Sequence, residues 1–127
     1  MLKQLSIKNY ALIDDLNVKF SHGFTTITGE TGAGKSIFLG GLSLVLGKRA
    51  DRSTLRDQDS KCIIEAEFEI GSYNLREFFI NQELDYDQHT ILRREILPSG
   101  KSRAFINDTP VTLDVLSTLG AQLIDIH

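Results

Sequence analysis

Residues 29–36 read Gly29-Glu30-Thr31-Gly32-Ala33-Gly34-Lys35-Ser36 and fit the pattern G-x-x-x-x-G-K-[ST]. The glycines let the backbone wrap an anion without Cβ clashes, and the N-terminal end of a following helix adds positive partial charge. A lysine at this position reaches the β- and γ-phosphates of a nucleotide, and the next hydroxyl can ligate Mg²⁺. The pattern therefore predicts that all eight residues bind nucleotide phosphates, with Lys35 as the catalytic residue and Ser36 as the metal ligand.

The segments on both sides of this loop have the composition that its mechanism requires. Before it, Phe24 to Thr28 is a β-prone run that predicts a strand. After it, residues 35–46 are apolar almost all round, which predicts a helix covered on more than one side. Gly40 and Gly41 weaken such a helix by about 1 kcal/mol each relative to alanine, so we expect close packing there. Gly47 is the expected C-cap.

Alternating apolar and polar residues predict most of the remaining strands. In the clearest of them, residues 64–70, apolar side chains alternate with Glu65, Glu67 and Glu69, which we expect to face solvent rather than bind a metal. The other expected strands are Leu2–Asn9 and Ile13–Phe20 as an antiparallel pair, Thr90–Leu97 and Ser102–Ile106 as a hairpin ended by Asn107-Asp108, and Gln122–Ile126. The other expected helices are residues 73–83 and a segment capped by Thr112 or Asp114 that ends at Leu119 and is closed by Gly120.

Length and composition exclude several classes of protein. The 127 residues, 41% hydrophobic and 24% charged, predict one globular domain or a piece of one. There is no apolar run of about 18 residues and no signal-peptide layout, so we expect a cytoplasmic protein. A single cysteine excludes an internal disulfide, three scattered histidines exclude a zinc module, and a formal charge of −3 gives no support for DNA binding through bulk charge.

Several stretches carry a closer resemblance to one family. They are Leu5 to Ile13, Phe24 to Ser36, Leu46 to Ala50, Leu92-Arg93-Arg94, Gly100 to Asn107 and Leu123 to His127. In these the chain resembles, over nearly its whole length, the N-terminus of RecN proteins, bacterial DNA double-strand-break repair ATPases related to SMC proteins. The phosphate loop is generic, but Thr28 to Ser36 combined with Ser102 to Asn107 and the final Asp125-Ile126-His127 is specific to this family.

The resemblance implies an α/β P-loop NTPase fold of the ABC/SMC-type ATPase head, with a mixed sheet and an antiparallel β portion. Residues 1–127 would be the N-terminal part of that head. In the family, the glutamine loop, coiled coil, signature motif and Walker B carboxylates follow later in the chain. The resemblance thus implies ATP and Mg²⁺ as cofactors. It implies DNA as the partner of the complete protein. The implied active form is a homodimer with ATP sandwiched between the two heads. The implied location is the cytoplasm, associated with the nucleoid. Hydrolysis would need the complete dimerised head, so the fragment alone is expected to be inactive.

Three other readings of the phosphate loop remain open. A self-contained P-loop kinase acting on a small molecule would need a carboxylate base and a lid, and no convincing pair is visible. Another SMC-like or RecF-like DNA-repair ATPase head would share the same loop. A non-catalytic domain could bind phosphate only for assembly.

The remaining candidates favour structural interpretations over functional ones. Arg49, Arg52 and Arg56 fit a solvated basic loop better than a γ-phosphate contact, and Lys8, Asn9 and Tyr10 fit an ordinary strand end better than a nucleotide contact. The basic residues Arg93, Arg94, Lys101 and Arg103 fit an edge that resists strand addition better than a DNA surface. Among single residues, we expect Glu30 to face outward, His22 to lie in a turn, Cys62 to be a core residue, and Asp125 and His127 to have no acid-base role.

Overall fold

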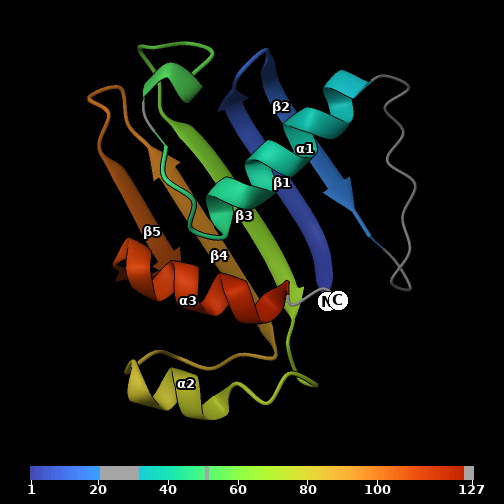
Figure 1. Cartoon of the computed structure of the whole chain (residues 1–127), viewed down its shortest axis with the longest axis vertical. Coiled ribbons are helices and arrows are strands. Elements are labelled where there is room, and N and C mark those ends of the chain that lie inside the picture. The colour runs from blue at the N-terminus through green and yellow to red at the C-terminus, as the bar shows by residue number, and fades with distance from the viewer. Residues whose placement is uncertain (21–31, 51, 125–127) are drawn as a thin grey trace.

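The computed structural model describes residues 1–20, 32–50 and 52–124 (Figure 1). Its strands are β1 (Leu2–Tyr10), β2 (Ile13–Lys19), β3 (Cys62–Glu69), β4 (His89–Ile96), β5 (Ser102–Ile106) and β6 (Thr109–Val111). Its helices are α1 (Gly32–Val45), the 3-10 turn η1 (Arg52–Thr54), α2 (Arg76–Asn81) and α3 (Leu113–Leu123). The strands form one sheet in the order β2-β1-β3-β4-β5-β6.

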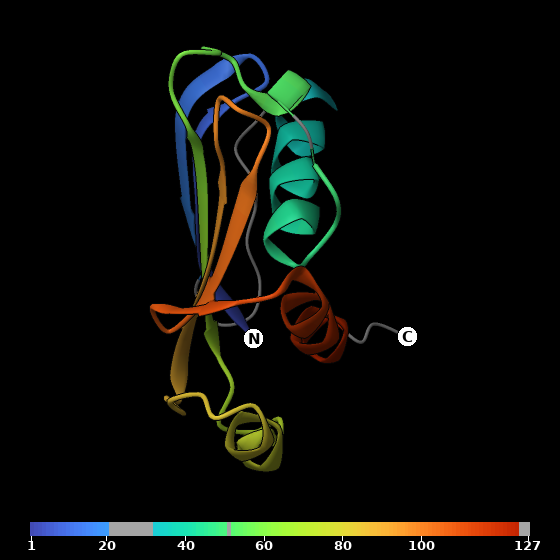
Figure 2. The same cartoon turned by 90° about the vertical axis from the view of Figure 1, so that its left-hand side faces the viewer.

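The molecule has two layers. Figure 2 shows α1 and α3 on one face of the sheet, with α2 beyond one end of it. The helix α1 packs against β1, β3 and β4, and α3 packs against β5. The opposite face of the sheet carries no helix in the described part of the chain.

The core lies between the sheet and these two helices, and the alternation along β3 shows why. Cys62, Ile64, Ala66 and Phe68 are all at most 1% exposed, whereas the residues between them are half-buried. Because successive side chains of a strand point to opposite faces, one face of β3 meets α1 and the other meets solvent. The prediction that the glutamates of β3 lie on the outer face is confirmed.

Two consecutive glycines let α1 approach β1 closely. A Cβ at Gly40 would overlap the Tyr10 hydroxyl, and one at Gly41 would overlap the Ile7 side chain. The predicted close packing of both glycines is confirmed, and it explains why poor helix formers occupy the middle of a helix.

Gly47 ends α1 as the predicted C-cap, in a Schellman motif. Gly47 has φ +109°, a conformation that favours glycine. Its N–H donates to the Leu44 carbonyl at 3.1 Å, and the Lys48 N–H donates to the Ser43 carbonyl at 3.1 Å. The chain therefore leaves the helix in a defined direction.

Most predicted elements are confirmed, including the β1–β2 pair and the β4–β5 hairpin. The predicted helix over residues 73–83 is present but shorter, as α2. Every pairing among the described strands is antiparallel, so the predicted mixed character of the sheet is not seen in this part of the chain. The predicted strand Phe24–Thr28 lies outside the described residues.

The C-terminal part differs from the prediction in three ways. Asn107-Asp108 ends the hairpin as predicted, but this turn leads into β6, a strand that was not predicted. Thr112 caps α3 by accepting a hydrogen bond from the Val115 N–H at 3.2 Å, as one of the two predicted caps. Gly120, however, lies inside α3, because the buried spacing Leu116, Leu119, Leu123 continues past it. The predicted strand Gln122–Ile126 is therefore wrong where it is described.

Candidate functional site

The first turn of α1 carries the end of the phosphate-binding pattern. The helix begins at Gly32, so Lys35 closes its first turn and Ser36 follows. Both side chains are exposed. The first turn holds no acidic residue that would neutralise the positive end of the helix dipole. Gly29, Glu30 and Thr31 lie outside the described residues.

This arrangement is suited to holding an anion. The unpaired N–H groups of a helix N-terminus attract negative charge, and a lysine ammonium beside them adds a mobile positive charge. A serine hydroxyl next to the lysine offers an oxygen ligand for a hard divalent cation. Lys35 and Ser36 could thus act on one phosphate group and its metal ion together.

Packing fixes α1 on the sheet, so the position of these two residues is defined by the fold. Phe38, Leu44 and Val45 are at most 6% exposed and belong to the main core cluster. The Phe38 ring lies 5.7 Å from that of Phe20, measured between centroids. The buried face of α1 therefore packs against the core, and its exposed first turn remains accessible to a ligand.

Arg94 is not on a solvated edge, and its inclusion among possible DNA contacts is wrong. Its side chain is 1% exposed, and Nη1 donates to the carbonyl oxygens of Leu44 and Lys48 at 2.8 and 2.7 Å. Burial lowers the pKa of the guanidinium below its ordinary value. The Arg94 side chain points to the inner face of the sheet, where it meets the end of α1.

The other basic residues of the β4–β5 hairpin lie on the outer face or at the turn. Arg93 pairs with Glu95 at 3.4 Å and with Asp108 at 3.1 Å, and its guanidinium stacks 4.2 Å from the centre of the Phe105 ring. Arg103 pairs with Glu95 at 3.6 Å. Arg93 and Arg103 are thus paired within the sheet, but the prediction of a sheet edge is wrong, because β4 lies between β3 and β5, and β5 lies between β4 and β6.

A clamp that the sequence did not reveal holds the basic loop after α1. The Asn9 amide nitrogen donates to the carbonyl oxygens of Asp57 and Ser60 at 2.9 and 3.0 Å, and its oxygen accepts from the Asp57 N–H at 2.7 Å. Arg56 in the same loop forms an ion pair with Asp14. Asn9 thus has a structural role at the end of β1.

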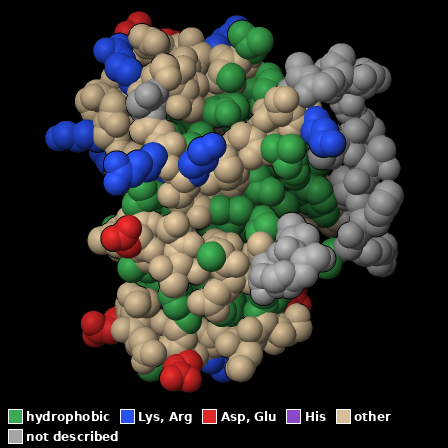
Figure 3. Space-filling view, viewed as in Figure 1, with side chains coloured by type: hydrophobic (Ala, Val, Ile, Leu, Met, Phe, Trp, Pro, Cys, Tyr) green, Lys and Arg blue, Asp and Glu red, His purple; other side chains and the backbone are tan. Residues whose placement is uncertain are grey.

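Beside this clamp lies a polar pocket of about 320 Å³. It is lined by Tyr10, by Gly40 and Ser43 of α1, and by Arg49 and Thr54 of the following loop. Burial raises the pKa of the Tyr10 hydroxyl. Figure 3 shows Lys and Arg side chains gathered over the upper half of the face that carries α1, with most Asp and Glu side chains at the lower end.

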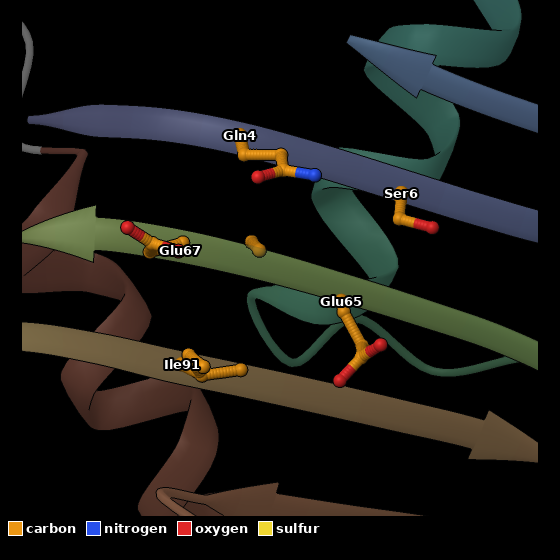
Figure 4. Close-up of a pocket in the computed structure, with 6 residues that line it drawn as sticks. Gln4, Ser6, Glu65, Glu67 and Ile91 are labelled. Carbon is orange, nitrogen blue, oxygen red and sulfur yellow. The ribbon is translucent and has the colours of Figure 1, made fainter. Parts of the chain in front are cut away.

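A second, smaller pocket of about 160 Å³ lies on the outer face of the sheet. Figure 4 shows Gln4 and Ser6 of β1, Glu65 and Glu67 of β3, and Ile91 of β4 around it, with α1 behind the sheet. Among the described residues no cluster of His, Cys, Asp and Glu could hold a metal ion. Because this pocket lies on the outer face of the sheet and α1 on the inner face, the sheet separates the pocket from the phosphate-binding turn.

Cys62 is a core residue, as predicted. Its side chain is fully buried on the inner face of β3, and burial raises the pKa of the thiol to about 12. The predicted positions of His22, Glu30, Asp125 and His127 lie outside the described residues.

Comparison with known proteins agrees with this geometry. A family model described as an AAA domain matches residues 4–124. The chain belongs to this AAA domain family. Membership of this family implies nucleotide binding. No helix of the described residues has both the length and the apolar character needed to cross a membrane.

This AAA domain is similar to proteins named DNA repair protein RecN. It is 45% identical to the RecN of Vibrio cholerae serotype O1, over 100% of this chain and 23% of that protein. It is 41% identical to the RecN of Xylella fastidiosa strain Temecula1, again over 100% of this chain and 23% of the relative. The predicted resemblance to RecN is confirmed, and the chain spans about a quarter of the length of these relatives.

The fold of the AAA domain is that of an SMC-type ATPase head. A structure from a study of ATP-driven dimerization and DNA stimulated activation of SMC ATPases superimposes with a TM-score of 0.72, at 18% identity. The match covers 97% of this chain and 79% of that one. The predicted α/β fold of the SMC-type head is confirmed.

Proposed function

We propose that this chain is the N-terminal, phosphate-binding part of the ATPase head of a RecN-like DNA repair protein, with residues 1–127 forming the Walker A half of the head. The observation that carries the proposal is the position of Lys35 and Ser36 in the first two turns of α1, a helix fixed on the sheet by its buried face. The RecN relatives supply the biological context. They favour a repair ATPase over the small-molecule kinase.

The residues present fit ATP with Mg²⁺. Backbone N–H groups of residues 29–34 and the Lys35 ammonium would hold the β- and γ-phosphates, and the Ser36 hydroxyl would ligate Mg²⁺. When bound, the metal ion neutralises phosphate charge during transfer to water. Lys35 stabilises the same charge directly, and α1 keeps the lysine oriented because its opposite face is buried.

The complete protein would act as a dimer on DNA. The SMC ATPases that share this fold are described as dimerising in an ATP-driven manner and as being activated by DNA. By analogy, ATP bound at Lys35 of one head would be covered by a second head, and hydrolysis would need both. A role at DNA double-strand breaks in bacteria would place the protein in the cytoplasm with the nucleoid.

Calorimetric titration of the full-length protein with Mg²⁺ and a non-hydrolysable ATP analogue tests this proposal. Lys35→Ala should reduce the affinity at least about a hundredfold, because the charge-assisted contact of the ammonium with the phosphates is lost. Lys101→Ala is the matched control, since Lys101 is an exposed lysine in the β4–β5 turn. Equal affinity in the Lys35 variant and the wild type would contradict the role assigned to Lys35.

A further inference from the structure

The C-terminal end of α1 is held by a buried guanidinium from the middle of the sheet. Arg94 of β4 donates through Nη1 to the carbonyl oxygens of Leu44 and Lys48, at 2.8 and 2.7 Å. Its Nη2 donates to the Ser102 hydroxyl of the neighbouring strand β5 at 3.2 Å. One side chain therefore ties two strands of the sheet to the last turn of α1, through Leu44, and to Lys48 just beyond its cap.

The choice of arginine at this buried position needs an explanation. A buried charge is costly to desolvate, and an apolar side chain of similar volume often serves stability as well or better. Among the described residues no carboxylate forms an ion pair with Arg94. Its acceptors are instead carbonyl oxygens at the negative end of the α1 dipole. What the guanidinium adds is direction, since two hydrogen bonds from one planar group fix where the helix ends.

A constraint on the C-terminal end of α1 also restricts the position of its N-terminal, phosphate-binding end. The helix has 14 residues and is about 21 Å long. Because its backbone hydrogen bonds make it stiff along its axis, fixing Leu44 also fixes Lys35. Gly41 against Ile7, and Gly120 of α3 against the Leu46 carbonyl, are already at contact and leave little room for the helix to slide.

We propose that Arg94 is a positioning residue for nucleotide binding, which sets the place of α1, and so of Lys35 and Ser36, by holding the Leu44 and Lys48 carbonyl groups. This inference rests on the proposed function, because it assumes that Lys35 and Ser36 meet a nucleoside triphosphate. Groups that act on phosphates must be placed accurately, and a shift of about 1 Å can cost orders of magnitude in rate.

Arg94→Lys in the full-length protein tests the proposal. Lysine keeps the charge, but its side chain is one bond shorter than that of arginine, so its ammonium cannot reach both carbonyl groups from the place that Nη1 occupies. We expect the dissociation constant of the non-hydrolysable ATP analogue with Mg²⁺ to rise about tenfold or more. The titration is made well below the melting temperature of every variant, so that only folded protein is compared.

Two controls separate positioning from stability. Ile106→Val removes one methyl group from a fully buried residue of β5 and lowers the melting temperature without touching a hydrogen bond to α1. Ser102→Ala removes only the bond between Arg94 and the sheet. We expect both to bind the analogue within about twofold of the wild type, even where the melting temperature falls as far as in Arg94→Lys.

Wild-type affinity in a folded Arg94→Lys protein would overturn the inference. An Ile106→Val protein of the same melting temperature that loses as much affinity as Arg94→Lys would also overturn it. If Arg94→Lys does not fold, Gly120→Ala takes its place, because the added Cβ presses on the Leu46 carbonyl and shifts the same end of α1. A folded Gly120→Ala protein with unchanged affinity would then overturn it. If the wild type itself does not bind the analogue, the proposed function fails instead.

Discussion

Asn9 and Asp57 bind each other in both directions across 48 positions of the chain. The Asn9 side-chain oxygen accepts from the Asp57 N–H at 2.7 Å, and the Asn9 amide nitrogen donates to the Asp57 carbonyl at 2.9 Å. Asn9 has φ 56°, a left-handed conformation that asparagine adopts more readily than most residues. The pair fixes the loop that carries Arg49, Arg52 and Arg56 against the end of β1.

Replacing Asn9 should loosen this loop and lower stability. For Asn9→Ala we expect a loss of about 1–2 kcal/mol in the free energy of unfolding, from the lost hydrogen bonds and the strain of alanine at positive φ. Asn9→Gly separates the two causes, because glycine tolerates the backbone conformation and loses only the bonds. Urea denaturation measures both. Asn17→Ala, at an exposed position whose side chain accepts one bond from Gln4, is the control, and a loss as large as that of Asn9→Ala would refute the clamp.

Close packing between α1 and β1 makes Gly41 intolerant of a side chain. Gly41→Ala improves intrinsic helix propensity by about 1 kcal/mol, yet its Cβ would overlap Ile7, a fully buried side chain. We expect the overlap to dominate and to give a net destabilisation of about 1–3 kcal/mol in thermal or chemical unfolding. Leu39→Ala, half exposed on the same helix, should change stability far less. A Gly41→Ala protein more stable than the wild type would contradict this prediction and show that the sheet shifts to accommodate the added methyl group.

The Cys62 thiol should be unreactive in the folded protein. Burial raises its pKa from 9.0 to about 12, so almost no thiolate exists at pH 8, and the side chain is fully buried. Alkylation of the Cys62 peptide, followed by mass spectrometry, should be slow in buffer and fast in urea. Rapid alkylation of folded protein would show that β3 is accessible.

The same shift makes stability fall at high pH. Above pH 9 the unfolded thiol loses its proton, whereas the folded thiol keeps it up to about pH 12. The unfolded state therefore binds fewer protons, and the free energy of unfolding decreases as pH rises through this window. Cys62→Ala should lack this component, so its stability should fall less steeply than that of the wild type between pH 9 and 11. Parallel pH profiles would contradict this assignment.

Local features of the sequence were enough to predict β1 to β5, α1 with its Gly47 cap, and the place of Lys35 and Ser36 in the first turns of α1. Strand alternation, helix periodicity and capping depend on residues within a few positions of one another, so they can be read along the chain. The resemblance to RecN rested on the same kind of local signal, in residues 28–36 and 102–107.

Contacts between distant residues were decided only by the tertiary structure. Arg94 was read as an edge charge because its neighbours in sequence are charged, but its partners Leu44 and Lys48 lie 50 and 46 positions away. Gly120 was read as a helix stop, yet it lies inside α3, where the Leu46 carbonyl fills the space in which a side chain would lie. The physical reason is common to both: burial and hydrogen-bond partners depend on what the folded chain brings together, and no local period records it.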